Sequence, residues 1–231
     1  MSVIDLTNIA GNFEIGKESK MSVVCVDLSS YQKGFDFQEF KEAGGLGVIL
    51  KATENNMKDS CYKSFKTAAQ KAGLAVASYH FMRHSEPVTQ AETFFNVVQP
   101  VAGERLVCDF EDNSVPANYV ISFLETLKNK NMNLQLTVYG SPYFLIEKFG
   151  SKNAWVAQET SLWLAEYTKS SHPAPVPSVW PTWSLWQYSD REVVKGFGKG
   201  VDASRFNGSD DLFLKWMGNV SPSSNQTSLV S

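Results

Sequence analysis

The chain of 231 residues is long enough to bury one full core, and a single α/β barrel of this length is ordinary. Its residues are 43% hydrophobic and 19% charged, as in a typical globular domain, and the net charge of -3 gives no reason to expect nucleic acid or an anionic membrane as partner. No apolar run approaches the roughly 20 residues of a membrane-spanning helix, so we expect no membrane insertion.

Strand and helix signals alternate along the first two thirds of the chain. Five apolar, β-branched segments, each followed by helical spacing, predict strands at 23–28, 47–52, 74–79, 105–110 and 134–139 and helices at 35–43, 61–72, 88–98, 117–130 and 142–149. Three more strands, separated by loops, are expected at 162–167, 183–188 and 200–205. Alternation of this kind predicts a parallel sheet, and eight strands predict that the sheet closes into a TIM-like α/β barrel.

The two ends of the chain are expected to lie outside this domain. Residues 1–20 form an N-terminal extension of unknown role, residues 21–218 the barrel domain, and residues 219–231 a flexible polar tail. No basic segment leads into an apolar stretch near the start, so we expect no secretory signal peptide. Met21-Ser22-Val23 repeats Met1-Ser2-Val3, which leaves translation from Met21 as an alternative.

The few cysteines and histidines do not suggest a disulfide scaffold or a metal centre. Cys25 shares a strand face with Asp27, whereas Cys108 faces away from Asp109, so these thiols are expected to point apart and to be buried. Three cysteines and three scattered histidines offer no metal-ligand spacing, so no metal and no cofactor are expected. His80 follows a strand, where a hydrogen-bonded structural role is favoured over contact with a substrate.

The most informative local motif is the Asp-x-Glu pair at the end of the fourth predicted strand. Residues 106–111 (LVCDFE) are an apolar run that ends in Asp109 and Glu111, which share one face of a strand about 7 Å apart. Two carboxylates crowded in this way repel each other, so one pKa is expected to rise while the other stays low. A proton donor beside a charge stabiliser is what cleavage of a glycosidic bond requires.

In a barrel of this kind the reactive groups gather where the strands end. The predicted strand ends bring acids to the same mouth, together with aromatic and polar side chains that suit sugar rings. These candidates are Asp27, Tyr79, Asp109, Glu111, Tyr139, Tyr167, Gln187 and, near the start of the last strand, Asp202.

Seven short motifs in this order resemble those of glycoside hydrolase family 25 muramidases. They are residues 26–32 (VDLSSYQ), 49–54 (ILKATE), 78–81 (SYHF), 108–111 (CDFE), 162–167 (LWLAEY), 186–188 (WQY) and 201–202 (VD). The resemblance covers about residues 23–217 and departs at Ser204, where the family usually has Asn. It implies the family's flattened barrel of five βα units followed by three strands with little helix. It also implies hydrolysis of the β-1,4 bond between N-acetylmuramic acid and N-acetylglucosamine in peptidoglycan.

The resemblance also implies roles for the four acids. Glu111 would be the general acid that protonates the leaving oxygen and later acts as base, while Asp109 would stay charged and orient the substrate's 2-acetamido group. Whether that group or an activated water attacks the anomeric carbon is left open. Asp27 and Asp202 would shape the acidic pocket, raise the pKa of Glu111 and hold sugar hydroxyls.

The remaining candidates would contact the substrate. The resemblance implies this role for Tyr79 and Tyr139, and Tyr167 and Gln187 are further candidates. The expected partner is therefore the peptidoglycan glycan strand, acted on by a monomer. Without a signal peptide, the enzyme would reach the wall by phage lysis, as an endolysin, or through a secretion apparatus.

Two alternatives are weighed against this interpretation. A family 18-like chitinase or endo-N-acetylglucosaminidase also carries Asp-x-Glu after its fourth strand, but its longer motif would require aspartates at positions 104 and 107. This chain has Glu104 and Val107 there. A non-catalytic glycan-binding barrel is the other alternative, and the presence of all four acids argues against it.

Overall fold

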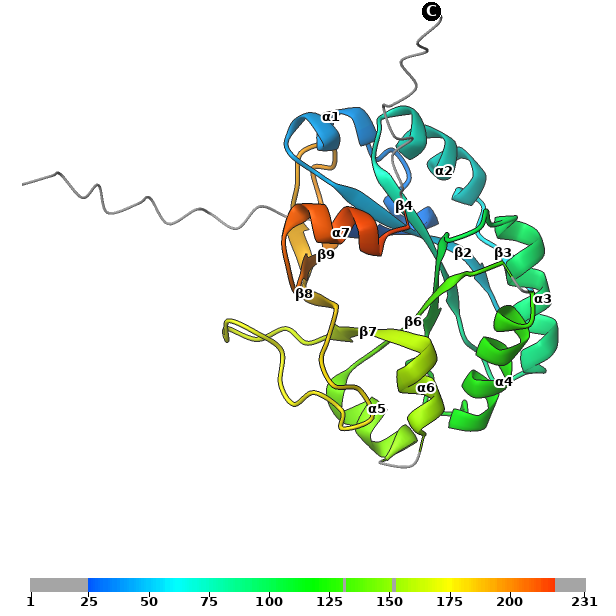
Figure 1. The fold of residues 1–231 in the computed structure, drawn as a ribbon. Helices are drawn as coiled ribbons and strands as arrows, with labels where there is room; N and C mark the ends of the chain where they lie inside the picture. The colour runs from blue at the N-terminus through cyan, green and yellow to red at the C-terminus, as the bar shows by residue number, and fades with distance from the viewer. Residues whose placement is uncertain (1–24, 131, 151–152, 219–231) are drawn as a thin grey trace, which may run out of the picture.

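The computed structural model describes residues 25–130, 132–150 and 153–218, and these form a closed barrel of eight strands (Figure 1). The barrel closes because β1 pairs with both β2 and β9. A ninth strand, β3, is short and folds back on β2 as a hairpin. The strands are β1 (Cys25–Leu28), β2 (Gly47–Glu54), β3 (Met57–Lys58), β4 (Ala75–Phe81), β5 (Arg105–Asp109), β6 (Gln135–Gly140), β7 (Thr160–Ala165), β8 (Leu185–Val193) and β9 (Gly200–Phe206).

The five βα units predicted from the sequence are confirmed. The helices are α1 (Phe37–Glu42), α2 (Tyr62–Lys71), α3 (Pro87–Val98), α4 (Ala117–Lys128), α5 (Pro142–Phe149), α6 (Ala154–Glu159) and α7 (Asp210–Trp216), and a 3-10 turn, η1 (Ser30–Gln32), follows β1. The sequence did not predict α6 and α7, which span fewer than two turns each and so show too little periodicity to recognise. Figure 1 shows α1 to α6 around the barrel, whereas β8 and β9 at its left edge are bordered by loops.

The prediction of a wholly parallel sheet is wrong at the last strand. β9 runs antiparallel to both of its neighbours, β1 and β8, whereas the other neighbouring barrel strands are parallel. The reason is the connection from β8 to β9, which is a hairpin-like loop without the crossover helix that a parallel return requires. The start of β9 therefore lies at the same end of the barrel as the ends of the parallel strands.

Strand register then brings the candidate residues together at that mouth. Asp27 pairs with Asp202 across β1 and β9. Asp109, the last residue of β5, lies between Phe81 of β4 and Tyr139 of β6. The mouth is thus built from residues that are far apart in the chain but adjacent in the sheet.

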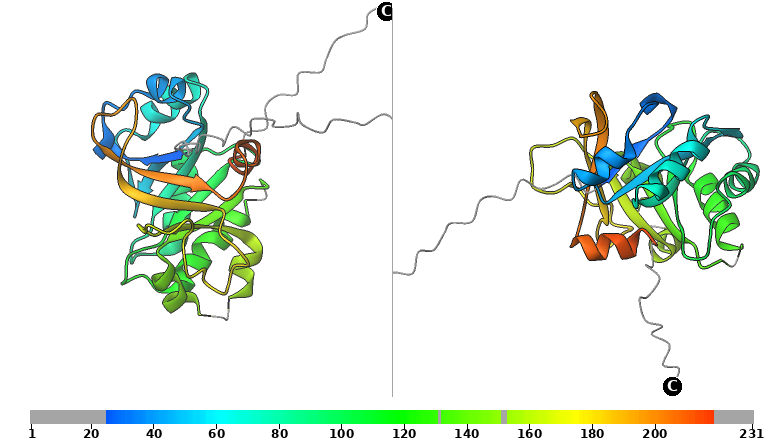
Figure 2. Two further views of the ribbon diagram at one scale, coloured as in Figure 1. Left: turned by 90° about the vertical axis from the view of Figure 1, so that its left-hand side faces the viewer. Right: turned by 90° about the horizontal axis from the view of Figure 1, so that it is seen from above.

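The opposite end of the barrel, its floor, is closed by α7. Phe213 and Met217 are buried with the apolar side chains of the barrel interior. A Cβ at Gly47 would meet the Phe213 ring at 3.0 Å, so a glycine at the start of β2 lets the ring approach the strand closely. Figure 2, right, shows α7 at one end of the barrel, away from the turn that joins β8 to β9.

The cysteines follow the expected pattern. All three, Cys25, Cys61 and Cys108, are free and buried. Cys25 belongs to the barrel interior, and Cys108 belongs to the larger apolar cluster between the strands and the surrounding helices. The predictions for residues 1–20, for a start at Met21 and for the tail at 219–231 lie outside the described residues, as do the first two residues of the predicted strand 23–28.

Candidate active site

A cavity of about 270 Å³ opens at the mouth of the barrel. All eight residues that the sequence singled out lie in its wall. The lining consists of Asp27, Ser29, Tyr31, Gln32, Lys51, Tyr79, Phe81, Asp109, Glu111, Tyr139, Trp163, Tyr167, Gln187 and Asp202. Four carboxylates thus face one hollow whose walls include several aromatic rings, a combination that suits the polar edges and apolar faces of sugars.

Asp27 and Asp202 form one acidic pair at the closure of the barrel. Asp27 is only 8% exposed, and burial together with the negative charge of Asp202 raises its pKa well above the ordinary value. Burial and the charge of Asp190 raise the pKa of Asp202 to about 6. The pKa values of both carboxyls are therefore raised, and the two groups titrate as a coupled pair.

Asp109, the last residue of β5, is 7% exposed. Burial, and then the charges of Glu111 and Asp27, raise its pKa well above the ordinary value. Its Oδ1 atom is buried and has no hydrogen-bond partner among the described residues. The sequence analysis expects Asp109 to stay charged; burial in the free site works against that charge, and the role of Asp109 stays a prediction.

Glu111 lies two residues beyond Asp109, past the end of β5, and is the more exposed of the two. Burial raises its pKa, although the cations Arg83 and Lys51 act to lower it. Burial, rather than the charges of Asp27 and Asp202 that the sequence analysis invoked, is the main cause. A carboxyl at the open side of the cavity with a raised pKa is suited to give a proton to a bound substrate.

Gln187 has a role that the sequence could not specify. Its Oε1 accepts hydrogen bonds from the hydroxyls of Tyr139 and Tyr167, both at 2.8 Å, and its Nε2 donates to Asp27 Oδ2 at 2.9 Å. Gln187 is 2% exposed, and these bonds provide hydrogen-bond partners for both the oxygen and the nitrogen of its buried amide. Gln187 thereby fixes two tyrosine rings and one carboxylate of the cavity wall relative to each other.

One wall of the cavity carries a cationic network that was not among the predicted site residues. Lys51 forms an ion pair with Glu54, which also accepts hydrogen bonds from Arg83 Nε at 2.9 Å and Nη2 at 2.7 Å. Arg83 Nη1 in turn donates to Asp112 at 3.0 Å, and its guanidinium stacks over the Phe81 ring at 4.4 Å. Lys51 and Phe81 lie in two of the motifs that resemble family 25, residues 49–54 and 78–81, so these motifs could have pointed to this wall of the cavity.

Two further positions take structural rather than site roles. His80 is buried on the helix-facing side, where Nδ1 and Thr53 Oγ1 lie 2.7 Å apart and Nε2 lies 3.1 Å from Gln90 Oε1. Burial lowers the pKa of His80 to about 4, so it is neutral. Ser204, where the chain departs from the family pattern, accepts a hydrogen bond from Trp163 Nε1 at 3.1 Å inside the barrel.

The arrangement as a whole is equipped for acid-base chemistry on a carbohydrate. It offers a proton donor at the rim, a buried carboxyl with an unused acceptor atom, and hydroxyls held by a buried amide. Within residues 25–218, wherever placement is described, no group of three or more His, Cys, Asp and Glu side chains has the geometry of a metal site.

Comparison with known proteins matches most of the chain to one family. The family model described as "Glycosyl hydrolases family 25" matches residues 26–197. The autolytic lysozyme of Clostridium acetobutylicum is 31% identical over 190 residues, which is 79% of this chain and 55% of the relative. The chain therefore spans about half the length of that relative.

Two other proteins extend the match over more of their own length. Lysozyme M1 of Streptomyces globisporus is 28% identical over 224 residues, covering 89% of this chain and 75% of the relative. The crystal structure of the bacterial lysozyme from Streptomyces coelicolor superimposes with a TM-score of 0.76 at 27% identity, covering 86% of this chain and 98% of that one.

Proposed function

The chain belongs to glycosyl hydrolases family 25, and from that membership and the cavity we propose that it is a peptidoglycan muramidase. It hydrolyses the β-1,4 bond between N-acetylmuramic acid and N-acetylglucosamine. The observation that carries the proposal is the convergence of Asp109 and Glu111 from one strand end with Asp27 and Asp202 on a single cavity lined by aromatic rings.

Glu111 supplies the proton in this proposal. It lies at the open side of the cavity, where the oxygen of a glycosidic bond can reach it, and its raised pKa keeps the carboxyl protonated to higher pH than an ordinary glutamate. It protonates the leaving oxygen as the bond breaks. In the second step the resulting carboxylate takes a proton from the attacking water.

Asp109 binds and orients the substrate's acetamido group in this proposal. Its buried Oδ1 lacks a partner, so an acetamido N–H can donate to it. That hydrogen bond favours the ionised carboxylate and offsets the burial that raises the pKa of Asp109. The charge is then in place to stabilise the cyclic cation that forms if the acetamido oxygen attacks the anomeric carbon.

Asp27, Asp202 and the tyrosines position the sugar. Asp202 and Tyr167 lie on the accessible part of the cavity wall and can hold sugar hydroxyls, while Tyr79 and Tyr139 provide ring faces. Gln187 acts through the groups it holds, since both sides of its amide are already bonded to protein.

The test is to identify the new reducing end. Purified peptidoglycan is digested, reduced with borohydride and analysed by mass spectrometry; we expect reduced muramic acid at the new ends. Reduced glucosamine would favour the chitinase-like alternative, and no new ends would favour a glycan-binding barrel. An anomeric product of retained configuration would support acetamido participation, and an inverted one would support direct attack by water.

The substrate places the action of the protein at the cell wall. None of the helices in the described part of the chain is long and apolar enough to cross a membrane. Release during phage lysis or delivery by a secretion apparatus stays our prediction for the route, and a monomer for the oligomeric state. Light scattering of the purified protein tests the latter, and activity that persists in a metal chelator tests the expected absence of a metal cofactor.

A further inference from the structure

Two further hollows continue from the catalytic cavity along one side of the molecule. The nearer one, about 290 Å³, lies between η1 and the β2–β3 hairpin and shares Tyr31 and Lys51 with the cavity. The farther one, about 560 Å³, lies between α2 and α3 and shares Lys58 with the nearer hollow. We call these two hollows together the side groove. The shared residues place it directly beside the catalytic cavity.

The side groove has the opposite charge character to the cavity. Lysines line it from end to end: Lys51, Lys58, Lys63 and Lys66. Lys58 and Lys63 are exposed, and within the described residues neither takes part in an ion pair. The groove therefore presents at least two positive charges to solvent.

The acids of the side groove leave it with a net positive charge, because they are outnumbered by its four lysines and none of them forms an ion pair with Lys58 or Lys63. Glu54 binds Lys51 and Arg83. Asp59 accepts hydrogen bonds from the backbone N–H groups of Ser30 and Cys61 at 3.0 and 2.8 Å. Glu104 binds Lys66 at 2.8 Å and accepts from the Val101 N–H at 3.0 Å.

The nearer hollow also offers apolar surface to a ligand. The Tyr31 side chain is 87% exposed and that of Met57 is 66% exposed, on opposite sides of the hollow's lining. Large apolar side chains this exposed beside free cations suit a ligand that is both acidic and partly apolar.

The spacing fits a short peptide attached to the bound sugar. Lys58 pairs with Thr53, two residues beyond Lys51 on β2, so the two lysine backbones lie about 8 Å apart. An extended peptide covers about 3.3–3.6 Å per residue, so two to three residues leading from the cavity would reach Lys58. In peptidoglycan, each muramic acid carries on its lactyl group a stem peptide with small residues and carboxylates, together with one diamino acid.

We propose that the side groove binds the stem peptide of the muramic acid held in the catalytic cavity. The peptide's carboxylates lie against Lys58 and Lys63, and its apolar side chains lie against Tyr31 and Met57. The inference rests on the proposed muramidase function, since it assigns the groove to another part of the same substrate.

The experiment compares two substrates that differ only in the peptide. One is purified glycan strands with intact stems; the other is the same strands after an amidase has removed the stems. We expect the wild-type protein to hydrolyse the peptide-bearing strands with the lower KM, and the preference to weaken as salt is added. Lys58→Glu should raise KM for peptide-bearing strands about fivefold, the upper range for an exposed ion pair, and so lower the preference.

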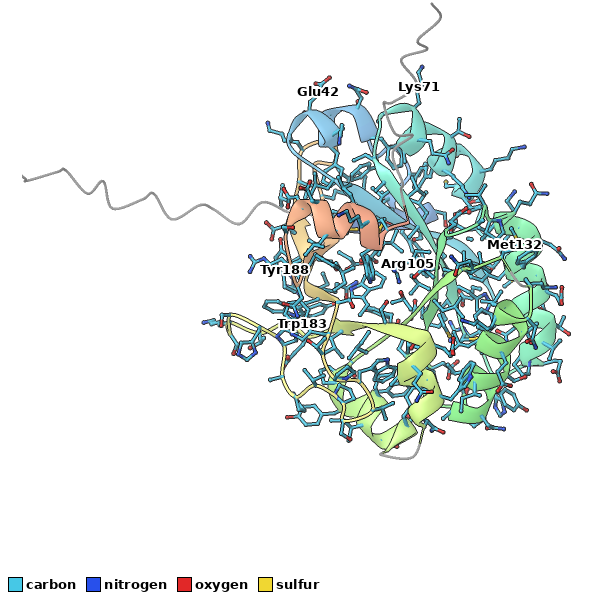
Figure 3. All side chains as sticks on the ribbon, viewed as in Figure 1. Glu42, Lys71, Arg105, Met132, Trp183 and Tyr188 are labelled. Carbon is cyan, nitrogen blue, oxygen red and sulfur yellow. The ribbon has the colours of Figure 1, made fainter. Side chains whose placement is uncertain are left out.

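Lys71→Glu is the matched control. Lys71 is an exposed lysine at the end of α2 that lines neither hollow, and Figure 3 shows it at the outer edge of the molecule. The same charge reversal there should leave the preference unchanged. Thermal melting of both variants establishes that they are folded.

The outcomes separate this inference from the proposed function. Equal hydrolysis of both substrates by the wild-type protein would overturn the side-groove assignment and leave the muramidase intact. If neither substrate yields reduced muramic acid, both the side-groove assignment and the proposed muramidase function are overturned. If Lys58→Glu raises KM equally on both substrates, and this effect disappears when phosphate-rich wall polymers are stripped with hydrofluoric acid, the groove would be assigned to such a polymer and the peptide overturned.

Discussion

The two ends of the barrel bury charge in opposite ways. At the floor, Arg105 is 4% exposed and has no carboxylate partner among the described residues, yet its Nε and Nη1 both donate hydrogen bonds. Nε donates to the Trp216 carbonyl, and Nη1 donates to the hydroxyls of Thr137 and Ser161 at 2.7 and 2.9 Å. The guanidinium also stacks 3.8 Å from the Trp216 ring, beside the end of α7 (Figure 3).

The mouth leaves part of the hydrogen-bonding capacity of its buried acids unused. The pKa values of Asp27, Asp109, Glu111 and Asp202 are all raised, with burial as the main cause, and Asp109 keeps an acceptor atom without a partner. Burial lowers the pKa of Arg105 to about 9, which still leaves the guanidinium charged at neutral pH. Neutral hydrogen-bond acceptors surround that charge. The difference indicates that the floor is built for stability, whereas the mouth keeps its unmet hydrogen-bonding capacity for a substrate.

The largest expected effect comes from Glu111→Gln at the mouth. The amide keeps the shape but has no transferable proton, so release of muropeptides should fall about 10²–10⁴-fold. Turbidity loss of cell-wall suspensions measures the rate. Glu42→Gln, an exposed position on α1, is the control and should behave as wild type. Full activity of Glu111→Gln would remove it as the acid.

Asp109→Asn tests whether the mouth sacrifices stability for function. We expect activity to fall about 10²-fold, because the charge that stabilises the cyclic cation is lost. The melting temperature should rise, because the amide removes a carboxylate that the folded site disfavours.

Asp112→Asn is the matched comparison for that stability gain. Hydrogen bonds from Ser114, together with Arg83, lower the pKa of Asp112, so its carboxylate is favoured in the folded state and this variant should melt lower. A lower melting temperature for Asp109→Asn as well would contradict the account of the mouth.

Arg105→Ala tests the floor. Truncation opens a cavity under Trp216 and leaves the hydroxyls of Thr137 and Ser161 without their donor, so we expect a loss of about 2–4 kcal/mol in urea unfolding. Activity below the melting transition should stay within about twofold, because the site lies at the other end. Arg191→Ala, a fully exposed arginine, should not change the unfolding midpoint.

The smallest expected effect is the pH dependence of stability. A carboxyl whose folded-state pKa is raised stabilises the fold when protonated, and that stabilisation is lost as the pH rises through the folded value. The pKa of Asp202, about 6, therefore predicts a melting temperature a few degrees lower at about pH 7.5 than at about pH 5. Asp202→Asn should flatten this slope, whereas an unchanged slope would mean that another group titrates.

The sequence predicted the features that local patterns carry. Apolar runs and helical spacing marked five βα units and eight strands, and acids at strand ends marked the cavity, because strand ends in such a barrel meet at one mouth. All eight predicted site residues lie in its wall. The resemblance to family 25 is confirmed by the family match.

What the sequence missed depends on contacts between distant segments. The reversal of β9 is a property of its connection, and local alternation is the same for parallel and antiparallel strands. The hydrogen bonds of Gln187 join it to residues that are far apart in the chain. Whether Asp109 Oδ1 has a partner depends on every group that surrounds that atom. The side groove is formed by separate elements, and Lys58, Lys63 and Lys66 belong to none of the motifs.

The seam between β1 and β9 also has a kinetic consequence. It joins the first and last strands of the barrel, so its contacts span the longest loop of the fold and are expected to form late. Asp27 and Asp202 face each other only after this seam closes. The active site is therefore absent from any folding intermediate that holds the βα units alone. Because the acidic pair opposes the closure, hydrogen exchange of the amides along β1 should speed up with pH more than the intrinsic rate does.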